Sequence, residues 1–225
     1  MDDRSPVNPL PPVVVALALL IVGVEAVLSL ADRGIVGGRE GIGWRISALE
    51  RYAAFDAPIE RMWALGTVDP NALMRLATYP FVHFGFVHAI MALVLTLALG
   101  KIVGESFHPA AVAAVWVVSG VVGALVWSVA VDTDAPLFGA YPPVYGLVGA
   151  FTFMVWARMQ GLGARRLRAF TLIGALLVFQ LVFGVLFGGG YDWIADLSGF
   201  AAGFLLSFVV SPGGWRAALE RIRQR

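Results

Sequence analysis

The sequence predicts an all-α membrane protein, on the evidence of its composition and of the spacing of its apolar segments. Of the 225 residues, 59% are hydrophobic and only 14% are charged, and the mean hydropathy is +0.82. Soluble domains carry about a quarter charged residues, so a soluble chain is excluded, and so is a disordered one. We therefore expect a single membrane domain over residues 1–225, with the lipid bilayer as its surroundings.

Six apolar segments approach the roughly 20 residues that a helix needs to cross a bilayer. The expected spans cover about residues 12–31, 79–100, 110–131, 144–159, 169–187 and 193–210. The long first loop, residues 32–78, contains apolar side chains at helical spacing, such as Trp44, Ala48 and Tyr52. Asp69-Pro70 is typical of a helix start. We expect a loop that is partly helical and lies partly in the membrane interface.

Basic residues predict the orientation of the spans, because they gather on the cytoplasmic side. The short loops 132–143 and 188–192 contain no Lys or Arg. The opposite side, which includes both termini, carries Arg4, Lys101, Arg158, Arg165, Arg166, Arg168, Arg216, Arg221, Arg223 and Arg225. Both termini are therefore expected in the cytoplasm of a bacterium, with the protein in its inner membrane. Because Asp2 and Asp3 precede the first arginine, no cleavable signal peptide is expected.

Charge and cysteine content limit the partners. A net charge of +1 leaves no large basic face for nucleic acid, and the absence of cysteine removes disulfides and thiolate metal sites. His83 and His88 are five residues apart and only loosely share a helix face. With Asp196 they make a poor ligand set for zinc. We expect no metal and no cofactor.

Ionisable side chains inside membrane spans are costly and usually functional. Here they are Glu25, His83, His88 and Asp196. For Glu25 three interpretations stay open: the carboxylate accepts a hydrogen bond from a neighbour in the bundle, the helix sits shallow enough for water to reach it, or it pairs with a polar group of span two or span six.

Three motifs contain most of these polar residues. The first is Arg75-x-x-Thr78, followed by His83 and His88. The second runs from Gly139 to Gly149 and includes a proline pair that suits the first turn of a helix. The third is Asp196-x-x-Gly199-x-x-x-Gly203, whose glycines allow two helices to approach closely.

In this order and spacing the motifs resemble those of the rhomboid family, the intramembrane serine proteases. The resemblance implies a rhomboid-like bundle of six transmembrane helices with a large first loop. It also implies that a set of framework positions is retained, namely Arg75, Thr78, His83, Gly139, Tyr145, Gly146, Gly199 and Gly203.

The catalytic positions of the family are replaced. The nucleophilic serine falls on Tyr141, the catalytic histidine on Asp196, and the oxyanion-binding positions on His88 and Ala92. A phenol is a bulky, weak nucleophile, and a proline at position 142 has no N–H to donate to an oxyanion. No intact catalytic residue set is therefore expected.

We accordingly expect a catalytically inactive pseudoprotease that binds transmembrane client segments, with the Tyr141 phenol donating to the Asp196 carboxylate. An alternative is an active intramembrane serine endopeptidase that uses another serine. The candidates are Ser119, Ser128, Ser198, Ser207 and Ser211. A second alternative is a small transporter or channel, since the acidic and histidine side chains suit a proton relay.

Overall fold

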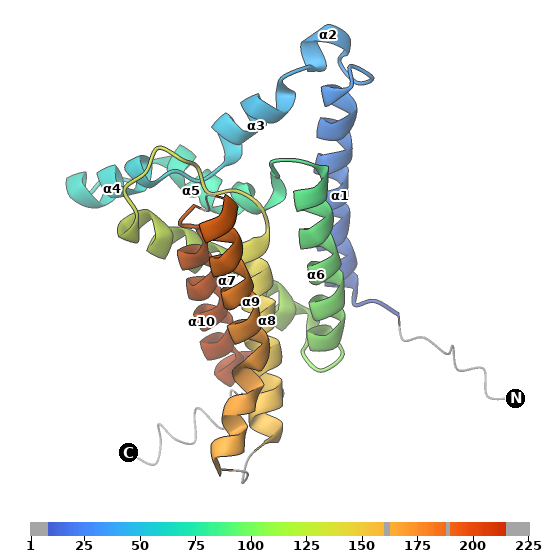
Figure 1. Ribbon diagram of the computed structural model, residues 1–225, viewed down its shortest axis with the longest axis vertical. Coiled ribbons are helices and arrows are strands. Elements are labelled where there is room, and N and C mark those ends of the chain that lie inside the picture. Colours follow the sequence, from blue (N-terminus) through green and yellow to red (C-terminus); the bar gives the residue numbers. More distant parts are fainter. Residues whose placement is uncertain (1–8, 160–162, 188–189, 215–225) are drawn as a thin grey trace, which may run out of the picture.

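The computed structural model describes residues 9–159, 163–187 and 190–214, and within these ranges the chain is built of helices (Figure 1). The long helices are α1 (Pro12–Asp32), α6 (Phe86–Gly104), α7 (Pro109–Ala130), α8 (Tyr141–Arg158), α9 (Thr171–Phe187) and α10 (Asp192–Val210). The first loop contains α2 (Gly38–Gly41), α3 (Trp44–Tyr52), α4 (Asp56–Leu65) and α5 (Pro70–Thr78). Two 3-10 helices, η1 (Tyr79–Phe81) and η2 (Gly163–Phe170), complete the described elements.

Four of the described helices, α1, α6, α7 and α10, are long and apolar enough to cross a membrane. Helices α8 and α9 contain 18 and 17 residues. The prediction of an all-α membrane protein is confirmed, and the partly helical first loop is present, with the Asp69 side chain capping α5 through the Asn71 N–H at 2.9 Å.

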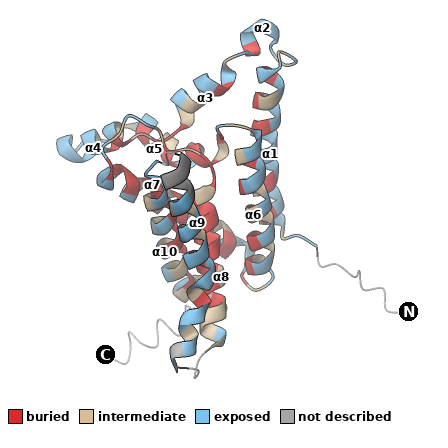
Figure 2. Cartoon of the chain, in the orientation of Figure 1, coloured by how far each residue is buried: buried red, intermediate tan, exposed pale blue. Residues whose placement is uncertain are grey.

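Helix α8 is the core of the bundle. Residues 142–150 are all buried, and Figure 2 shows the buried residues gathered where α7, α8 and α10 pack together. Helices α1 and α6 pack against each other beside this group (Figure 1). Helices that pack this closely in a membrane need small residues where they cross, and the glycines of α8 and α10 provide them.

The second long helix of the bundle begins at Phe86, not at Tyr79 as the run of apolar residues predicts. The backbone carbonyls before it accept hydrogen bonds from other parts of the chain. The Tyr79 carbonyl accepts from the Gly139 N–H at 2.9 Å, and the His83 carbonyl accepts from Arg45 at 2.9 Å. Residues 79–85 therefore form a short 3-10 turn and an extended segment that tie the first loop to the start of α8.

Candidate functional site

The turn before α8 brings the first two motifs together. Gly139 has φ +88°, a left-handed conformation that favours glycine. A Cβ atom at this position would lie 2.7 Å from Cε1 of His88 and 3.4 Å from Cδ2 of His83. Glycine therefore serves both the turn and the close approach of the two imidazoles.

His83, His88 and Tyr141 form a stacked cluster at this turn. The ring of Tyr141 is stacked on that of His88, with centroids 4.9 Å apart and planes inclined by 19°. His88 in turn meets the His83 ring edge-on at 5.4 Å. Nε2 of His83 accepts from the Ala140 N–H at 3.4 Å, which makes Nδ1 its protonated nitrogen when the ring is neutral.

The electrostatics of His83 follow from its burial in the segment before α6. Its side chain is fully buried. Burial, followed by the proximity of His88, lowers its pKa from 6.5 to about 4. His83 is therefore neutral at physiological pH and acts as an acceptor for the backbone of the Gly139 turn.

Asp196 lies in α10, and its hydrogen-bond partner comes from α9. Oδ2 of Asp196 accepts from the Gln180 amide nitrogen, and Oε1 of Gln180 accepts from the Tyr145 hydroxyl at 3.1 Å. Three helices are thus joined by one chain of side chains. The predicted hydrogen bond from Tyr141 to Asp196 is wrong: the Gln180 amide occupies Oδ2, and Oδ1 is buried without a hydrogen-bond partner in the described part of the chain.

The positions that the family resemblance predicts to bind an oxyanion carry few hydrogen-bond donors. Ala92 is fully buried and has no polar side chain. Pro142 lies in the first turn of α8, where its missing N–H suits a helix start but removes a donor. His88 retains an imidazole, which is covered by the Tyr141 ring.

The other framework glycines set the crossings of α8. A Cβ atom on Gly203 would lie 2.1 Å from the Gly146 carbonyl oxygen, and one on Gly199 would lie 2.3 Å from that of Pro142. Gly146 itself faces α7, where Oγ of Ser119 would lie 2.1 Å from an added Cβ. The expected close approach through Gly199 and Gly203 is confirmed, and it fixes Asp196 beside α8.

Arg75 and Thr78 lie away from this cluster and hold the first loop. The Arg75 guanidinium donates to the Ala53 carbonyl at 2.8 Å and lies over the Phe55 ring at 5.2 Å. The Thr78 hydroxyl donates to the Tyr52 carbonyl at 3.0 Å. Their contribution to the site is therefore to position the segment that leads to His83.

The serine hydroxyls of the described ranges make no hydrogen bond to an imidazole. Those of Ser128, Ser198 and Ser207 donate to carbonyl oxygens of their own helices at 2.7 to 2.9 Å. Oγ of Ser119 is buried without a hydrogen-bond partner. In the same ranges, no three His, Asp or Glu side chains are grouped as ligands for a metal ion.

Two residues of this site and its surroundings escape prediction from the motifs. Gln180 is the one amide in the apolar stretch 171–187, which is a sequence signal for a buried role. Arg45 donates to both carboxylate oxygens of Glu25, at 2.9 and 3.0 Å. Glu25 also accepts from the Ser29 hydroxyl of α1 at 2.6 Å. Its described partners therefore come from its own helix and from the first loop, and neither span two nor span six supplies one.

These features define a polytopic, all-α membrane protein. Its histidine and tyrosine rings are stacked at the turn before α8, and the Tyr145–Gln180–Asp196 hydrogen bonds join α8, α9 and α10. A family model, the rhomboid domain, matches residues 70–213, and the chain belongs to the rhomboid family.

Three curated relatives match more distantly. The chain is 27% identical over 60% of its length to "RHOMBOID-like protein 4" of Arabidopsis thaliana. It is likewise 27% identical over 60% of its length to "Putative rhomboid protease YdcA" of Bacillus subtilis. It is 25% identical over 69% of its length to "Inactive rhomboid protein 1" of Danio rerio. These matches cover 34%, 66% and 18% of the relatives' own lengths, so the chain spans less than two thirds of each.

Proposed function

We propose that this protein is a rhomboid pseudoprotease, which binds transmembrane segments of client proteins and does not cleave them. The proposal rests on the side chains at the two positions that the motifs align with the family's nucleophile and base. A phenol ring stacked on His88 stands at the nucleophile position. A carboxylate that accepts from Gln180 stands at the base position.

The chemistry of acyl transfer supports the same conclusion. A serine-type reaction needs a hydroxyl beside a base and donors directed at the developing oxyanion. The residues at the corresponding positions provide neither an aliphatic hydroxyl beside an imidazole nor the donors for an oxyanion. These residues are Tyr141, Asp196, Ala92 and Pro142. In a well-studied serine protease, loss of the triad costs on the order of a million-fold in rate. The retained glycine framework, by contrast, is what the bundle needs to keep its shape and accept a neighbouring helix.

The membrane arrangement belongs to the proposal as well. The proposed arrangement has six crossings and both termini in the cytoplasm of a bacterial cell. It is supported by Lys101 and the basic segment 165–168, which it places on the cytoplasmic side. Because the chain contains no cysteine, single cysteines can be introduced and tested with a membrane-impermeant thiol reagent. We expect the reagent to label a cysteine at position 134 from outside intact cells. A cysteine at position 165 should stay protected.

Binding and cleavage are tested together on the full-length protein in lipid vesicles. A photoreactive amino acid at position 141 is expected to crosslink to a co-reconstituted, labelled transmembrane segment. The same group at Leu205, an exposed position of α10, is the control and should crosslink less. The segment is expected to keep its full mass.

An active protease is the second candidate, favoured by the similarity to the "Putative rhomboid protease YdcA" of Bacillus subtilis. Release of a shorter product in the vesicle assay would support it. If that product persists in Tyr141→Phe and Asp196→Ala but disappears in Ser119→Ala, a rearranged serine site replaces the pseudoprotease proposal. Crosslinking without any product supports the pseudoprotease.

A further inference from the structure

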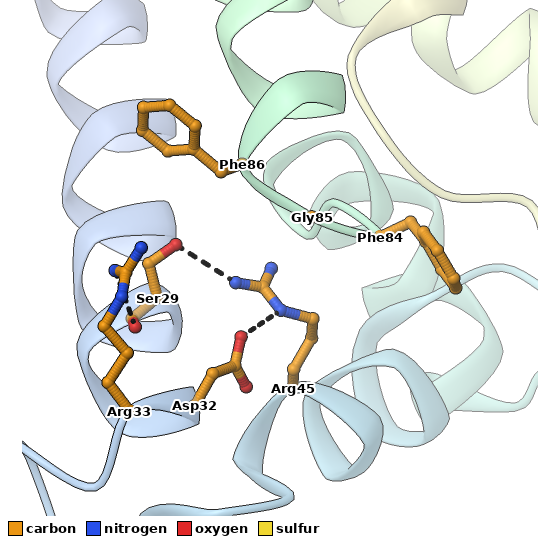
Figure 3. Close-up of a pocket in the computed structure, with 7 residues that line it drawn as sticks. All are labelled: Ser29, Asp32, Arg33, Arg45, Phe84, Gly85 and Phe86. Atoms are coloured by element: carbon orange, nitrogen blue, oxygen red, sulfur yellow. Dashed lines mark hydrogen bonds and ion pairs between the residues drawn. The ribbon is translucent and has the colours of Figure 1, made fainter.

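A pocket of about 320 Å³ lies outside the cluster around Tyr141, between the end of α1, helix α3 and the beginning of α6 (Figure 3). It is lined by Ser29, Asp32, Arg33, Arg45, Phe84, Gly85 and Phe86. Figure 3 shows Arg33 and Asp32 on the α1 side and Arg45 facing them from α3, with the Phe86 ring reaching toward α1.

The position of the pocket places it at the level of lipid headgroups. Asp32 is the last residue of α1 and Phe86 is the first residue of α6, and both helices are long and apolar enough to cross the membrane. About 20 helical residues cross the hydrocarbon region, and α1 and α6 contain 21 and 19 residues, so we take their ends to lie near its boundary. Phe86 is 57% exposed and its ring reaches toward α1 (Figure 3), which leaves an apolar ring beside the polar lining for the glycerol and acyl part of a lipid. The Phe84 ring points away from the charged residues and stacks on Phe138.

The pocket offers donors to an anion. The Arg33 guanidinium uses one N–H, which donates to the Ser29 carbonyl at 3.2 Å, and the side chain is otherwise exposed. The first turn of α6 begins at Gly85 without a side-chain cap, so its leading N–H groups lack intrahelical acceptors. A phosphate is an anion of the size and charge that an arginine beside a helix start binds.

The same pocket offers an acceptor to a cation. Oδ2 of Asp32 accepts from Nε of Arg45 at 2.7 Å. Its other oxygen, Oδ1, has no hydrogen-bond partner in the described ranges, and the side chain is 39% exposed. Arg45 is also paired with Glu25. The two guanidinium groups of Arg33 and Arg45 and the two carboxylates of Asp32 and Glu25 therefore add up to a formal charge of zero. A neutral pocket with one free donor group and one free acceptor fits a zwitterion better than a simple anion.

We propose that this pocket binds the headgroup of a phospholipid that carries both a phosphate and a primary ammonium, such as phosphatidylethanolamine. Arg33 and the α6 start hold the phosphate, and Asp32 accepts from the ammonium. A quaternary ammonium has no N–H to donate, so a choline headgroup loses the second contact. Arg45 forms one wall of the pocket and also donates to the His83 carbonyl, which links the lipid site to the segment that holds the imidazoles.

The proposal goes beyond client binding and is tested without a client. The full chain, delipidated in mild detergent, is titrated with phosphatidylethanolamine and with phosphatidylcholine of the same acyl chains, and bound lipid is counted by native mass spectrometry. A charge-assisted hydrogen bond predicts a preference of about tenfold for the ethanolamine lipid. Arg33→Gln is expected to weaken retention of both lipids, whereas Arg39→Gln, an exposed arginine of the same loop, leaves it unchanged.

The specificity arm uses Asp32→Asn, which is expected to abolish the preference between the two lipids while binding persists. Its thermal unfolding in detergent is measured alongside, because Arg45 loses a charged acceptor, and Arg33→Gln supplies an independent readout if Asp32→Asn unfolds. Equal retention of the two lipids by the unaltered protein overturns the proposal. So does an equal thermal shift with inorganic phosphate or soluble glycerophosphoethanolamine, since the source is then no lipid.

Discussion

The Tyr141 ring lies stacked on the His88 ring, with 4.9 Å between centroids and 19° between planes. The phenol makes no hydrogen bond to a described residue, so the contribution of Tyr141 comes from its ring. Offset aromatic pairs contribute about 0.5–1.5 kcal/mol beyond the area that they bury. A double-mutant cycle of Tyr141→Ala and His88→Ala, followed by unfolding in detergent, is expected to show a coupling energy in this range. Tyr141→Phe should be nearly neutral, and a large loss in that variant would point to a hydrogen bond of the hydroxyl.

Burial of His83 predicts a dependence of stability on pH. Its pKa is lowered from 6.5 to about 4 in the folded protein, so the unfolded chain binds this proton at higher pH than the folded chain does. The free energy of unfolding therefore falls as pH drops from about 6.5 to about 4, by about 3 kcal/mol for this group, and this contribution levels off below that range.

The variant His83→Gln isolates that contribution, because glutamine keeps an acceptor for the Ala140 N–H and does not titrate. Unfolding of both proteins is followed between about pH 7 and pH 4. The unaltered protein should lose more stability on acidification than the variant. Parallel curves would show that His83 has an ordinary pKa in the folded state.

The ion pair between Glu25 and Arg45 ties the first loop to α1. Both side chains are buried, and removing one partner of a buried pair leaves an uncompensated charge that costs about 3–5 kcal/mol. Arg45→Met should show a loss of this size in unfolding experiments. The control is Arg51→Met, an exposed arginine of the same helix. The double variant Glu25→Gln with Arg45→Met should recover part of the loss, and failure to recover any would assign it to packing instead.

The chain of hydrogen bonds through Gln180 predicts that this residue holds α9 against the bundle. Gln180→Leu removes the donor to Asp196 and the acceptor of the Tyr145 hydroxyl, and buried polar groups left without partners cost about 1–3 kcal/mol. Most described side chains of α9 are otherwise exposed or half-buried. Spin labels at Val182 and Leu205, introduced into this cysteine-free chain, should show a broader distance distribution in Gln180→Leu. Val178→Leu, an exposed position of α9, is the matched control and should leave the distribution unchanged.

The sequence predicts helices where apolar runs are long, and α1, α7 and α10 lie close to the expected ranges because burial in lipid depends mainly on such runs. It fails for residues 79–85, where apolar residues are interrupted by backbone hydrogen bonds to Arg45 and Gly139. The predicted partner of Asp196 is wrong for a related reason. Spacing shows which residues share one helix face, but the residue of another helix that meets this face depends on the crossing, as with Gln180.

The crossing of α8 and α10 depends on Gly203, and this contact gives a prediction with a matched control. A Cβ atom at Gly203 would lie 2.1 Å from the Gly146 carbonyl oxygen, whereas one at Gly23 of α1 would meet nothing within 4 Å. Backbone atoms cannot rotate away as a side chain does, so Gly203→Ala must separate the two helices and should cost about 1–3 kcal/mol. Gly23→Ala should be neutral or raise stability by about 0.5–1 kcal/mol, because alanine favours the helix. Equal unfolding free energies for the two variants would contradict the close crossing that places Asp196 beside α8.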